Sequence, residues 1–248
     1  MPSCDFNALV RLAVDAWPAL ETSPIDGWLW RCSGGGSKRA NSATTVGFTG
    51  GDLDASIDKV EALYRVRGQA ARFQVEEIST PLGLAARLTE RGYTLEEITV
   101  NMAKPVRLAA PAPGDDGCSR TGTPTPAWLA VYLSAITPDR RIINRRILQG
   151  VPEPRAFFLC RNDEGWPVSS GLCVASGPLG IIECMATAPH VRRSGGARRI
   201  LAAIETWARQ QGVERLFLQV VETNAPAVAL YAQAGFSAVA QTRYFVRA

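Results

Sequence analysis

The sequence predicts an α/β protein of the α+β type, in which two similar halves each form a mixed, mostly antiparallel sheet flanked by helices. Three observations predict it. Apolar runs of strand length alternate along the chain with runs whose apolar residues recur at helical spacing. Helix, strand, helix and strand follow in the same order in each half, which indicates an internal repeat. Between the halves, residues 104–125 are rich in glycine and proline and carry no periodicity, as is typical of a linker.

The first half follows a simple plan in which two helices alternate with two strands. The second helix ends at Gly92, because glycine readily adopts the left-handed conformation that closes a helix. We expect this half to form a domain over residues 1–104, followed by a linker over 105–117. Its predicted elements are a helix over 56–64, a strand over 71–78, a helix over 84–91 and a strand over 97–102.

The second half, residues 118–248, begins with two helices and three strands before it returns to the same plan. Turn-forming clusters at 162–165 and 177–180 join the three strands, as expected for antiparallel hairpins. Its predicted elements are helices over 127–136 and 139–148, strands over 156–161, 168–175 and 181–187, a helix over 200–210, a strand over 216–221, a helix over 225–234 and a strand over 243–246.

A glycine loop joins the predicted strand over 181–187 to the predicted helix over 200–210, with the sequence Arg192-Arg193-Ser194-Gly195-Gly196-Ala197-Arg198-Arg199. Glycines let backbone N–H groups turn toward a ligand, and a helix N-terminus presents unpaired donors and a partial positive charge. The arginines add cationic groups that suit phosphate oxygens. The loop therefore predicts a pyrophosphate site, while a tight turn before a helix is the alternative for this segment.

A second motif lies further along, at the start of the predicted helix over 225–234. Together, in this order and spacing, the two motifs resemble those of the GNAT family of acyl-CoA-dependent N-acyltransferases. The resemblance covers the chain from about Cys118 onward and implies acetyl-CoA as the cofactor. The family's first motif, Arg/Gln-x-x-Gly-x-Gly/Ala, is matched at Arg192, Gly195 and Ala197, and its second, Asn-x-x-Ala-x-x-Leu-Tyr followed by Gly-Phe, at Asn224, Ala227, Leu230, Tyr231, Gly235 and Phe236.

The first half has a different glycine loop, over residues 34–42, which no helix follows at once. Its Lys-Arg-x-Asn-Ser stretch is similar to one in bacterial tandem GNAT proteins, whose N-terminal domain is degenerate. The resemblance therefore implies two tandem GNAT folds, of which the second, over 118–248, is the catalytic N-acetyltransferase domain. The loop is either a flexible surface hairpin or a cover for the acceptor cleft, where Lys38, Arg39 and Asn41 would contact an acidic or polar acceptor.

The resemblance also implies where the cofactor lies. In GNAT proteins the strand before the loop and the strand after the helix diverge, and the pantetheine arm lies in the opening against the backbone of the first strand. Arg193 and Arg198 are the arginines expected closest to the phosphates. The cofactor residues implied are Met185, Ala186, Thr187, Arg192, Arg193, Ser194, Gly195, Gly196, Ala197, Arg198, Asn224, Ala227 and Tyr231.

The reaction implied is direct attack of a primary amine on the thioester. Tyr231 matches the family's tyrosine that protonates the departing sulfur, and a phenol of pKa about 10 suits a thiolate of similar basicity. Glu183 is the candidate base, because a carboxylate is uncommon in an apolar strand and burial raises its pKa. Alternation along the strand predicts that Glu183 shares a face with Met185 and Thr187.

Other routes for the proton of the amine stay open. Glu183 is explained equally well as the partner of an arginine across the sheet. Glu222 directly follows the strand over 216–221, and His190 has a suitable pKa but adjoins the glycine loop. A chain of water molecules needs no single base. The backbone N–H of Met185, or of a neighbour, is the donor that the resemblance implies for the thioester carbonyl.

Composition limits the remaining function classes. The formal net charge of +4 comes partly from the arginine loop, and no basic stretch alternates with aromatic residues, so we expect no nucleic-acid partner. No apolar run has the length of a membrane span and the N-terminus lacks a leader pattern, so we expect a soluble, cytoplasmic protein. The six cysteines lack close spacing and His190 is the single histidine, which predicts free thiols and no metal.

The sequence therefore predicts an acetyl-CoA-dependent N-acetyltransferase that acts on a small-molecule or peptide amine. The alternative is a catalytically inactive acyl-CoA-binding module with a regulatory or scaffold role. Tyr231 favours the enzyme, since a binding module needs no acid at the sulfur. A Walker or dinucleotide loop is excluded, because no Lys-Ser/Thr follows the glycines and their spacing is not Gly-x-Gly-x-x-Gly. The identity of the amine, and whether the protein is a monomer or a homodimer, stay open.

Overall fold

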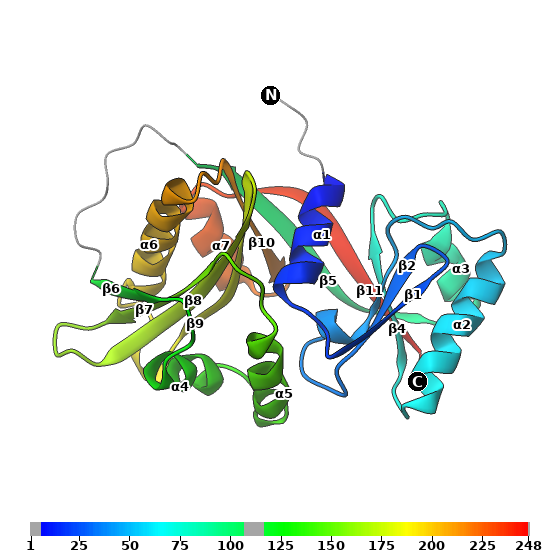
Figure 1. The fold of residues 1–248 in the computed structure, drawn as a ribbon, viewed down its shortest axis with the longest axis horizontal. Helices are drawn as coiled ribbons and strands as arrows, with labels where there is room; N and C mark the ends of the chain where they lie inside the picture. The colour runs from blue at the N-terminus through cyan, green and yellow to red at the C-terminus, as the bar shows by residue number, and fades with distance from the viewer. Residues whose placement is uncertain (1–5, 107–116, 248) are drawn as a thin grey trace.

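The computed structural model describes residues 6–106 and 117–247, in which helices cover both faces of one continuous sheet (Figure 1). Among these residues the sheet has eleven strands, in the order β1-β2-β3-β4-β11-β5-β10-β9-β8-β7-β6. The strands are β1 (Glu21–Ile25), β2 (Trp28–Cys32), β3 (Ala43–Thr44), β4 (Ala71–Glu76), β5 (Thr94–Pro105), β6 (Cys118–Thr121), β7 (Arg155–Arg161), β8 (Pro167–Ser176), β9 (Leu179–Thr187), β10 (Arg215–Val221) and β11 (Ser237–Arg247).

The predicted fold class is confirmed, and each predicted helix and strand is present. The structure also contains a first helix, α1 (Phe6–Ala16), and the strands β1, β2, β3 and β6, which the sequence analysis does not predict. Strand β3 has two residues, and β1 and β6 lie at the two edges of the sheet. Helix α1 and strand β2 precede the glycine loop over residues 34–42. The helices are α1 (Phe6–Ala16), α2 (Leu53–Val66), α3 (Leu84–Glu90), α4 (Pro126–Ser134), α5 (Pro138–Gln149), α6 (Gly196–Gln210) and α7 (Ala225–Gln233), with short 3₁₀ turns η1 (Arg39–Asn41) and η2 (Pro189–Val191).

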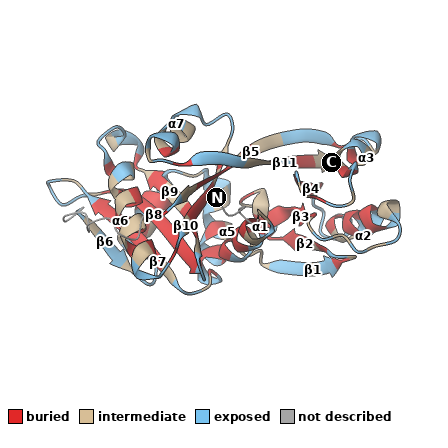
Figure 2. Cartoon of the chain, turned by 90° about the horizontal axis from the view of Figure 1, so that it is seen from above, coloured by how far each residue is buried: buried red, intermediate tan, exposed pale blue. Residues whose placement is uncertain are grey.

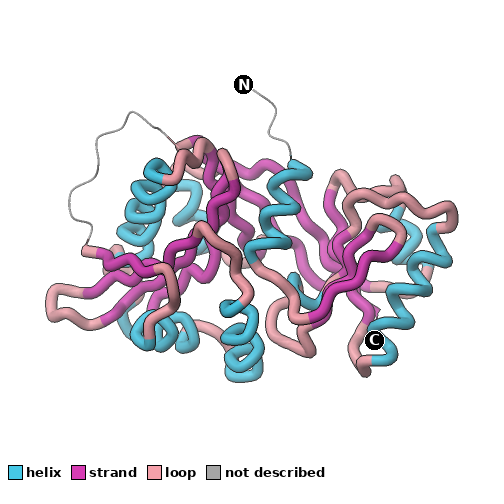
Figure 3. The backbone as a smooth tube through the Cα atoms, in the orientation of Figure 1, coloured by secondary structure: helices cyan, strands magenta, loops and turns pink. Residues whose placement is uncertain are grey.

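The two halves exchange strands. The last strand of the chain, β11, lies between β4 and β5 of the first half, and β5 in turn pairs antiparallel with β10 of the second half. Both are long strands that run from one group of helices to the other (Figure 1, Figure 3). The division into domains over 1–104 and 118–248 stays a prediction, but the sheet itself is continuous across the boundary.

Each face of the second half has its own apolar core. Helices α1, α4 and α5 pack on one face, against side chains such as Ile181 and Phe217. Helix α6 and part of α7 pack on the other face, against the alternate residues Ile182, Leu216 and Leu218. Figure 2 shows the buried residues concentrated on the strands between these layers. The first half has a third core, between its sheet and helices α2 and α3.

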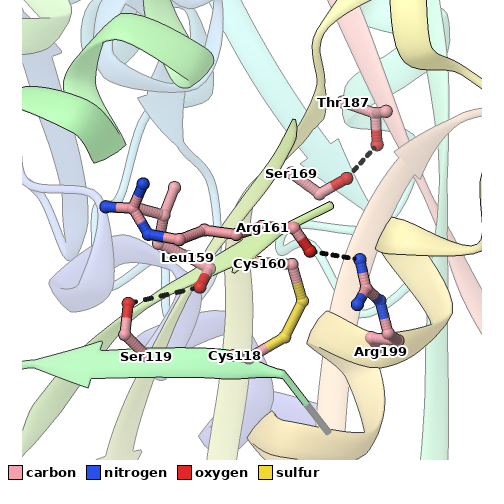
Figure 4. The surroundings of a disulfide bond; sticks show 8 residues. All are labelled: Cys118, Ser119, Leu159, Cys160, Arg161, Ser169, Thr187 and Arg199. Atoms are coloured by element: carbon pink, nitrogen blue, oxygen red, sulfur yellow. Dashed lines mark hydrogen bonds between the residues drawn. A yellow bond between two sulfur atoms is a disulfide. The ribbon is translucent and has the colours of Figure 1, made fainter. Parts of the chain in front are cut away.

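The expectation that all cysteines are free thiols is wrong for one pair. Cys118 on β6 lies directly opposite Cys160 on β7, and the two form a disulfide with their Cα atoms 4.2 Å apart (Figure 4). They are 42 residues apart in sequence, so their spacing carried no signal, and only the antiparallel pairing brings them together. Cys32, Cys173 and Cys184 are free, whereas Cys4 lies outside the described residues.

Candidate functional site

Strands β9 and β10 separate partway along their length. Their parallel pairing ends with Ile182 opposite Leu218, although β9 continues to Thr187 and β10 to Val221. Beyond this point the facing backbone N–H and C=O groups have no partner in the neighbouring strand. A cavity of about 470 Å³ lies at this opening and is lined by both strands. The divergence implied by the family resemblance is therefore present.

A β-bulge in β9 changes which way its side chains point. Cys184 has a φ of 53°, and the pairing of β9 with β8 shifts register at this place. Strict alternation predicted that Glu183 shares a face with Met185 and Thr187. That prediction is wrong, because the bulge turns Met185 and Thr187 to the other face of the sheet. Cys184 packs against the core of α1 and α4, whereas Met185 packs against the core of α6, and Thr187 bonds Ser169 beneath the start of α6 (Figure 4).

The glycine loop leads directly into α6. Gly195 takes the helix N-cap position with a φ of 80°, a left-handed conformation that glycine adopts without strain. Gly196 lies so close to β8 that a Cβ atom there would be 2.3 Å from the Ser169 Oγ. In this described segment the N–H groups of Gly195, Gly196 and Ala197 donate no hydrogen bond. The loop is thus a tight turn that leaves its donors open.

The loop is also electropositive. Arg192 and Arg193 are exposed and form no ion pair with a described residue. Arg198 donates to the Gln233 Oε1 at 2.5 Å, and Arg199 donates to the backbone oxygen of Arg161 at 2.7 Å (Figure 4). Since these acceptors are neutral, the positive charge of the loop is not compensated by the described residues. Such a helix start is suited to an anion.

Helix α7 brings Tyr231 to the opposite wall of the opening. Asn224 caps this helix, since its side chain accepts from the backbone N–H of Ala227, and both residues line the cavity. Tyr231 also lines the cavity and is 8% exposed. Its burial, reinforced by the nearby charge of Glu183, raises the pKa of Tyr231 to about 12. The phenol therefore keeps its proton at neutral pH.

Glu183 is held by an arginine from the first half of the chain. Arg39, in η1, donates to both carboxylate oxygens of Glu183, at 2.6 and 2.5 Å, and also to the Gln219 Oε1 at 2.9 Å. The Glu183 side chain is 6% exposed, so this bidentate pair is largely removed from water. The alternative explanation of Glu183 predicted an arginine partner across the sheet. Glu183 does pair with an arginine, but this arginine lies in the short turn η1 and not on a strand.

The loop over residues 34–42 lines one side of the cavity with its residues 36–39. Asn41 stabilises its turn, because its side chain accepts from the Ser33 N–H at 2.8 Å and donates to the backbone oxygen of Ser37 at 2.8 Å. Lys38 and Arg39 line the cavity, and Lys38 pairs with Glu97 at 2.9 Å. The expectation that Asn41 contacts the acceptor is wrong, since its side chain is used within the loop.

A chain of buried polar groups continues from Arg39 across the sheet. Arg39 donates to Gln219, Gln219 to the Asn101 Oδ1, Asn101 to the Thr242 Oγ1, and Thr242 to the Glu76 Oε2, each at 2.6 to 2.9 Å. An arginine only donates and a carboxylate only accepts, so the two ends fix the direction of every bond between them. The chain crosses β10, β5, β11 and β4, and therefore joins both halves.

Some of these residues carry a signal that sequence reasoning missed. Gln219 is a polar residue within an apolar strand sequence, as Glu183 is, and Asn101 adjoins the apolar residues Val100 and Met102, whereas Thr242 lies in a mixed strand. Buried polar side chains in strands need partners, so polar positions in several strands predict a shared network. Arg140, which lines the cavity from α5, has no comparable signal because it lies in a charged helix.

The remaining base candidates lie away from this cavity. The Glu222 Oε1 accepts from the Gln241 side chain at 3.0 Å, and Glu222 lines a separate depression beside β5. His190 is exposed in η2, next to the glycine loop. Of the predicted acid and base candidates, Glu183 and Tyr231 line the cavity, together with the predicted cofactor residues Met185, Asn224 and Ala227.

The described residues 6–106 and 117–247 contain neither a membrane-spanning helix nor a cluster of metal ligands. None of their helices is long and apolar enough to cross a bilayer. No three histidine, cysteine, aspartate or glutamate side chains in these ranges gather into a set suited to a metal ion.

Comparison with known proteins places these features in context. A family model described as "Probable histone acetyltransferase Rv0428c C-terminal" matches residues 4–245. The uncharacterized N-acetyltransferase YobR of Bacillus subtilis is 27% identical over 249 residues, which cover 98% of this chain and 99% of that protein.

Solved structures share the fold over most of the chain. A GCN5-related N-acetyltransferase from Kribbella flavida superposes with a TM-score of 0.67 at 18% identity, covering 98% of this chain and 93% of that chain. A tandem GNAT protein from the clavulanic acid biosynthesis pathway superposes with a TM-score of 0.61 at 18% identity, covering 83% of this chain and 74% of that chain.

Proposed function

The chain belongs to the GNAT family of N-acetyltransferases, and we propose that it moves the acetyl group of acetyl-CoA onto a primary amine by direct attack on the thioester. One observation carries the proposal. The opening between β9 and β10 joins the face of α6 and α7, where the glycine loop lies, to the face where Arg39 meets Glu183. A thioester and an amine that enter from opposite faces of the sheet meet at this opening.

The residues around the loop fit a cofactor that carries a diphosphate. Unpaired N–H groups at the start of α6 and the uncompensated charge of Arg192, Arg193 and Arg198 suit phosphate oxygens. The free edge of β9 over residues 185–187 offers backbone groups to the amides of a pantetheine arm. When bound, acetyl-CoA supplies the acetyl group as an activated thioester.

Tyr231 is the proposed acid. Its pKa of about 12 keeps the phenol protonated, and it faces the cavity from α7. A proton donated from this hydroxyl stabilises the departing thiolate. The bound proton is therefore available throughout the physiological pH range.

Glu183 is the proposed destination of the proton of the amine. Its two oxygens accept from Arg39, yet an ionised carboxylate has about four lone-pair sites and so retains capacity for another donor. An amine or a water molecule in the cavity can donate to it. Arg39 holds this carboxylate in one orientation, which favours a defined position of the amine.

Direct attack is favoured over an acyl-enzyme because the thiol in the cavity is a poor nucleophile. Cys184 lines the cavity and is free. Burial, reinforced by the charge of Glu183, raises the pKa of the Cys184 thiol well above its ordinary value. The thiol therefore stays protonated at neutral pH, and the thiolate that an acyl-cysteine requires is scarce.

The test of this function is a binding measurement followed by a turnover measurement on the full chain. We expect calorimetry to detect acetyl-CoA binding, and a thiol-specific reagent to detect CoA release that depends on an added primary amine. Mass spectrometry of the amine should show the addition of one acetyl group. Binding without amine-dependent release across a broad panel would instead favour an inactive acyl-CoA-binding module.

A further inference from the structure

The carboxylates that line the cavity are already engaged. Glu183 accepts two hydrogen bonds from Arg39, and Glu97 pairs with Lys38 at 2.9 Å. Each of these carboxylates already pairs with a cation of the protein, so neither is left to pair with a second ammonium group of an acceptor that carries several. An amine with several positive charges therefore finds no unengaged carboxylate among the cavity residues.

A third cation, Arg140, lines the same cavity and forms no salt bridge with a described residue. Arg140 lies in the first turn of α5 and reaches the wall formed with Tyr132 and Cys184. Its Nε is buried and has no hydrogen-bond partner, and its guanidinium forms no ion pair with any described residue. A buried N–H of a charged group that lacks an acceptor is unfavourable, so this position is suited to an anionic acceptor atom from a ligand.

A second buried donor lacks a partner as well. Tyr244, on β11, is 1% exposed, and its hydroxyl lines the cavity without a hydrogen bond to the described residues. Burial raises the pKa of Tyr244 well above its ordinary value, so the hydroxyl remains a donor. The cavity is thus lined by three cations and two carboxylates, and the Arg140 Nε and the Tyr244 hydroxyl are buried without a hydrogen-bond partner among the described residues.

We propose that the acetyl acceptor is a small amine that also carries a carboxylate, of the size of an amino acid, and that Arg140 binds this carboxylate. The inference rests on the proposed transferase function, and it names the substrate class of the same site. The cavity of about 470 Å³ must also admit the thioester, which limits the acceptor to a small molecule. Arg140 is then a specificity-determining residue on α5, the helix whose Ile143 and Asn144 lie beside Gly36 of the loop over residues 34–42.

The experiment compares acceptors that differ only in the carboxylate. The full chain is assayed by CoA release at saturating acetyl-CoA with an α-amino acid series, the matching carboxamides, the matching amines without a carboxyl group, and a polyamine. We expect kcat/KM to be about 10- to 100-fold higher for the carboxylates than for their carboxamides, as loss of a charge-assisted pair predicts. Arg140→Gln should remove this preference by lowering the value for carboxylates alone.

Arg141→Gln is the matched control. It removes the same charge from the next residue of α5, which is exposed and does not line the cavity, and the carboxylate preference should remain. Equal rates for carboxylates and carboxamides, a polyamine as the best acceptor, or equal effects of the two variants would overturn the assignment while leaving the transferase intact. If acetyl-CoA binds but no amine releases CoA, the proposed function fails, and the assignment of its acceptor fails with it.

Discussion

At the scale of single residues, the site depends on two buried side chains that face one opening from different elements. Tyr231 approaches from α7 and Glu183 from β9, and their proximity is visible in the effect of Glu183 on the phenol, whose pKa it helps to raise. Burial strengthens this coupling, because charges interact more strongly where water is excluded. Arg39 balances the charge of Glu183 without occupying the phenol.

Tyr231→Phe tests the proposed acid. The change removes the hydroxyl and keeps the ring that packs 6.1 Å from Phe236, so we expect little change in stability. We expect kcat to fall about 100-fold, as is typical for loss of a positioned acid, with the Kd for acetyl-CoA unchanged.

The pH dependence provides a second measurement of the same residue. The pKa of Tyr231 is raised to about 12, so the phenol loses its proton only as pH rises through that value. The wild-type rate should therefore show no loss attributable to this acid between about pH 7 and 10. A wild-type rate that falls in this range but becomes flat in Tyr231→Phe would contradict the raised pKa of Tyr231, although it would still identify the phenol as the acid.

At the scale of elements, the start of α6 is determined by its packing against β8. Gly195 supplies a left-handed turn, and Gly196 allows the helix to approach Ser169 more closely than any side chain permits. This approach places the open N–H groups of the loop beside β8, at Ser169, which pairs with Thr187 at the end of β9. One helix position therefore links the proposed phosphate site to the proposed pantetheine site.

Gly196→Ala tests this link. A Cβ at this position would lie 2.3 Å from the Ser169 Oγ, so the helix start must shift. We expect a loss of about 1 to 3 kcal/mol in the free energy of unfolding, and weaker acetyl-CoA binding by calorimetry. Gly122→Ala is the control, because a Cβ there meets nothing within 4 Å and should change neither quantity. Unaltered affinity in Gly196→Ala would show that the loop does not depend on this contact.

At the scale of the whole molecule, the first half contributes directly to the site. It supplies Arg39 and Lys38 from its loop, and strand β5 adjoins β10. The directional chain from Arg39 to Glu76 passes through β5 and β11, the two strands that the halves exchange. The orientation of the site is therefore coupled to the assembly of the entire sheet.

Thr242→Val tests the coupling. It removes the hydroxyl that accepts from Asn101 and donates to Glu76, so the Asn101 amide loses its acceptor and the buried Glu76 carboxylate loses a donor. We expect a loss of about 1 to 3 kcal/mol in stability, together with a severalfold fall in kcat/KM for the amine and an unchanged Kd for acetyl-CoA. Thr242→Ser should restore both quantities.

Thr45→Val is the matched control for that variant. Thr45 is also 0% exposed, and its hydroxyl bonds the backbone oxygen of Gln74 and the hydroxyl of Ser79. It is not a member of the hydrogen-bond chain from Arg39 to Glu76. It should lower stability without affecting amine kinetics. If both variants lower kcat/KM for the amine equally, the hydrogen-bond chain from Arg39 to Glu76 has no special role in positioning Arg39.

Much of the fold was predictable because its signals are local. The helix over 200–210, the strand over 216–221 and the capped helix at Asn224 follow from periodicity and turn residues within a few positions. The face of Glu183 was predicted wrongly, because a bulge at Cys184 has no reliable sequence signal. The Cys118–Cys160 disulfide was missed because strand pairing brings together residues that are distant along the chain.

The sequence by itself determined the order of helices and strands, the glycine loop with its arginines, and the membership in an N-acetyltransferase family that these motifs indicate. Tertiary structure alone decided that β11 joins the first half, that Arg39 reaches Glu183, and that Arg140 lines the same cavity with its Nε unbonded to any described residue. The physical reason is the distance along the sequence over which each kind of interaction acts. Backbone conformation and capping depend on neighbouring residues, whereas a buried charge takes its partner from whichever segment the packed sheet places beside it.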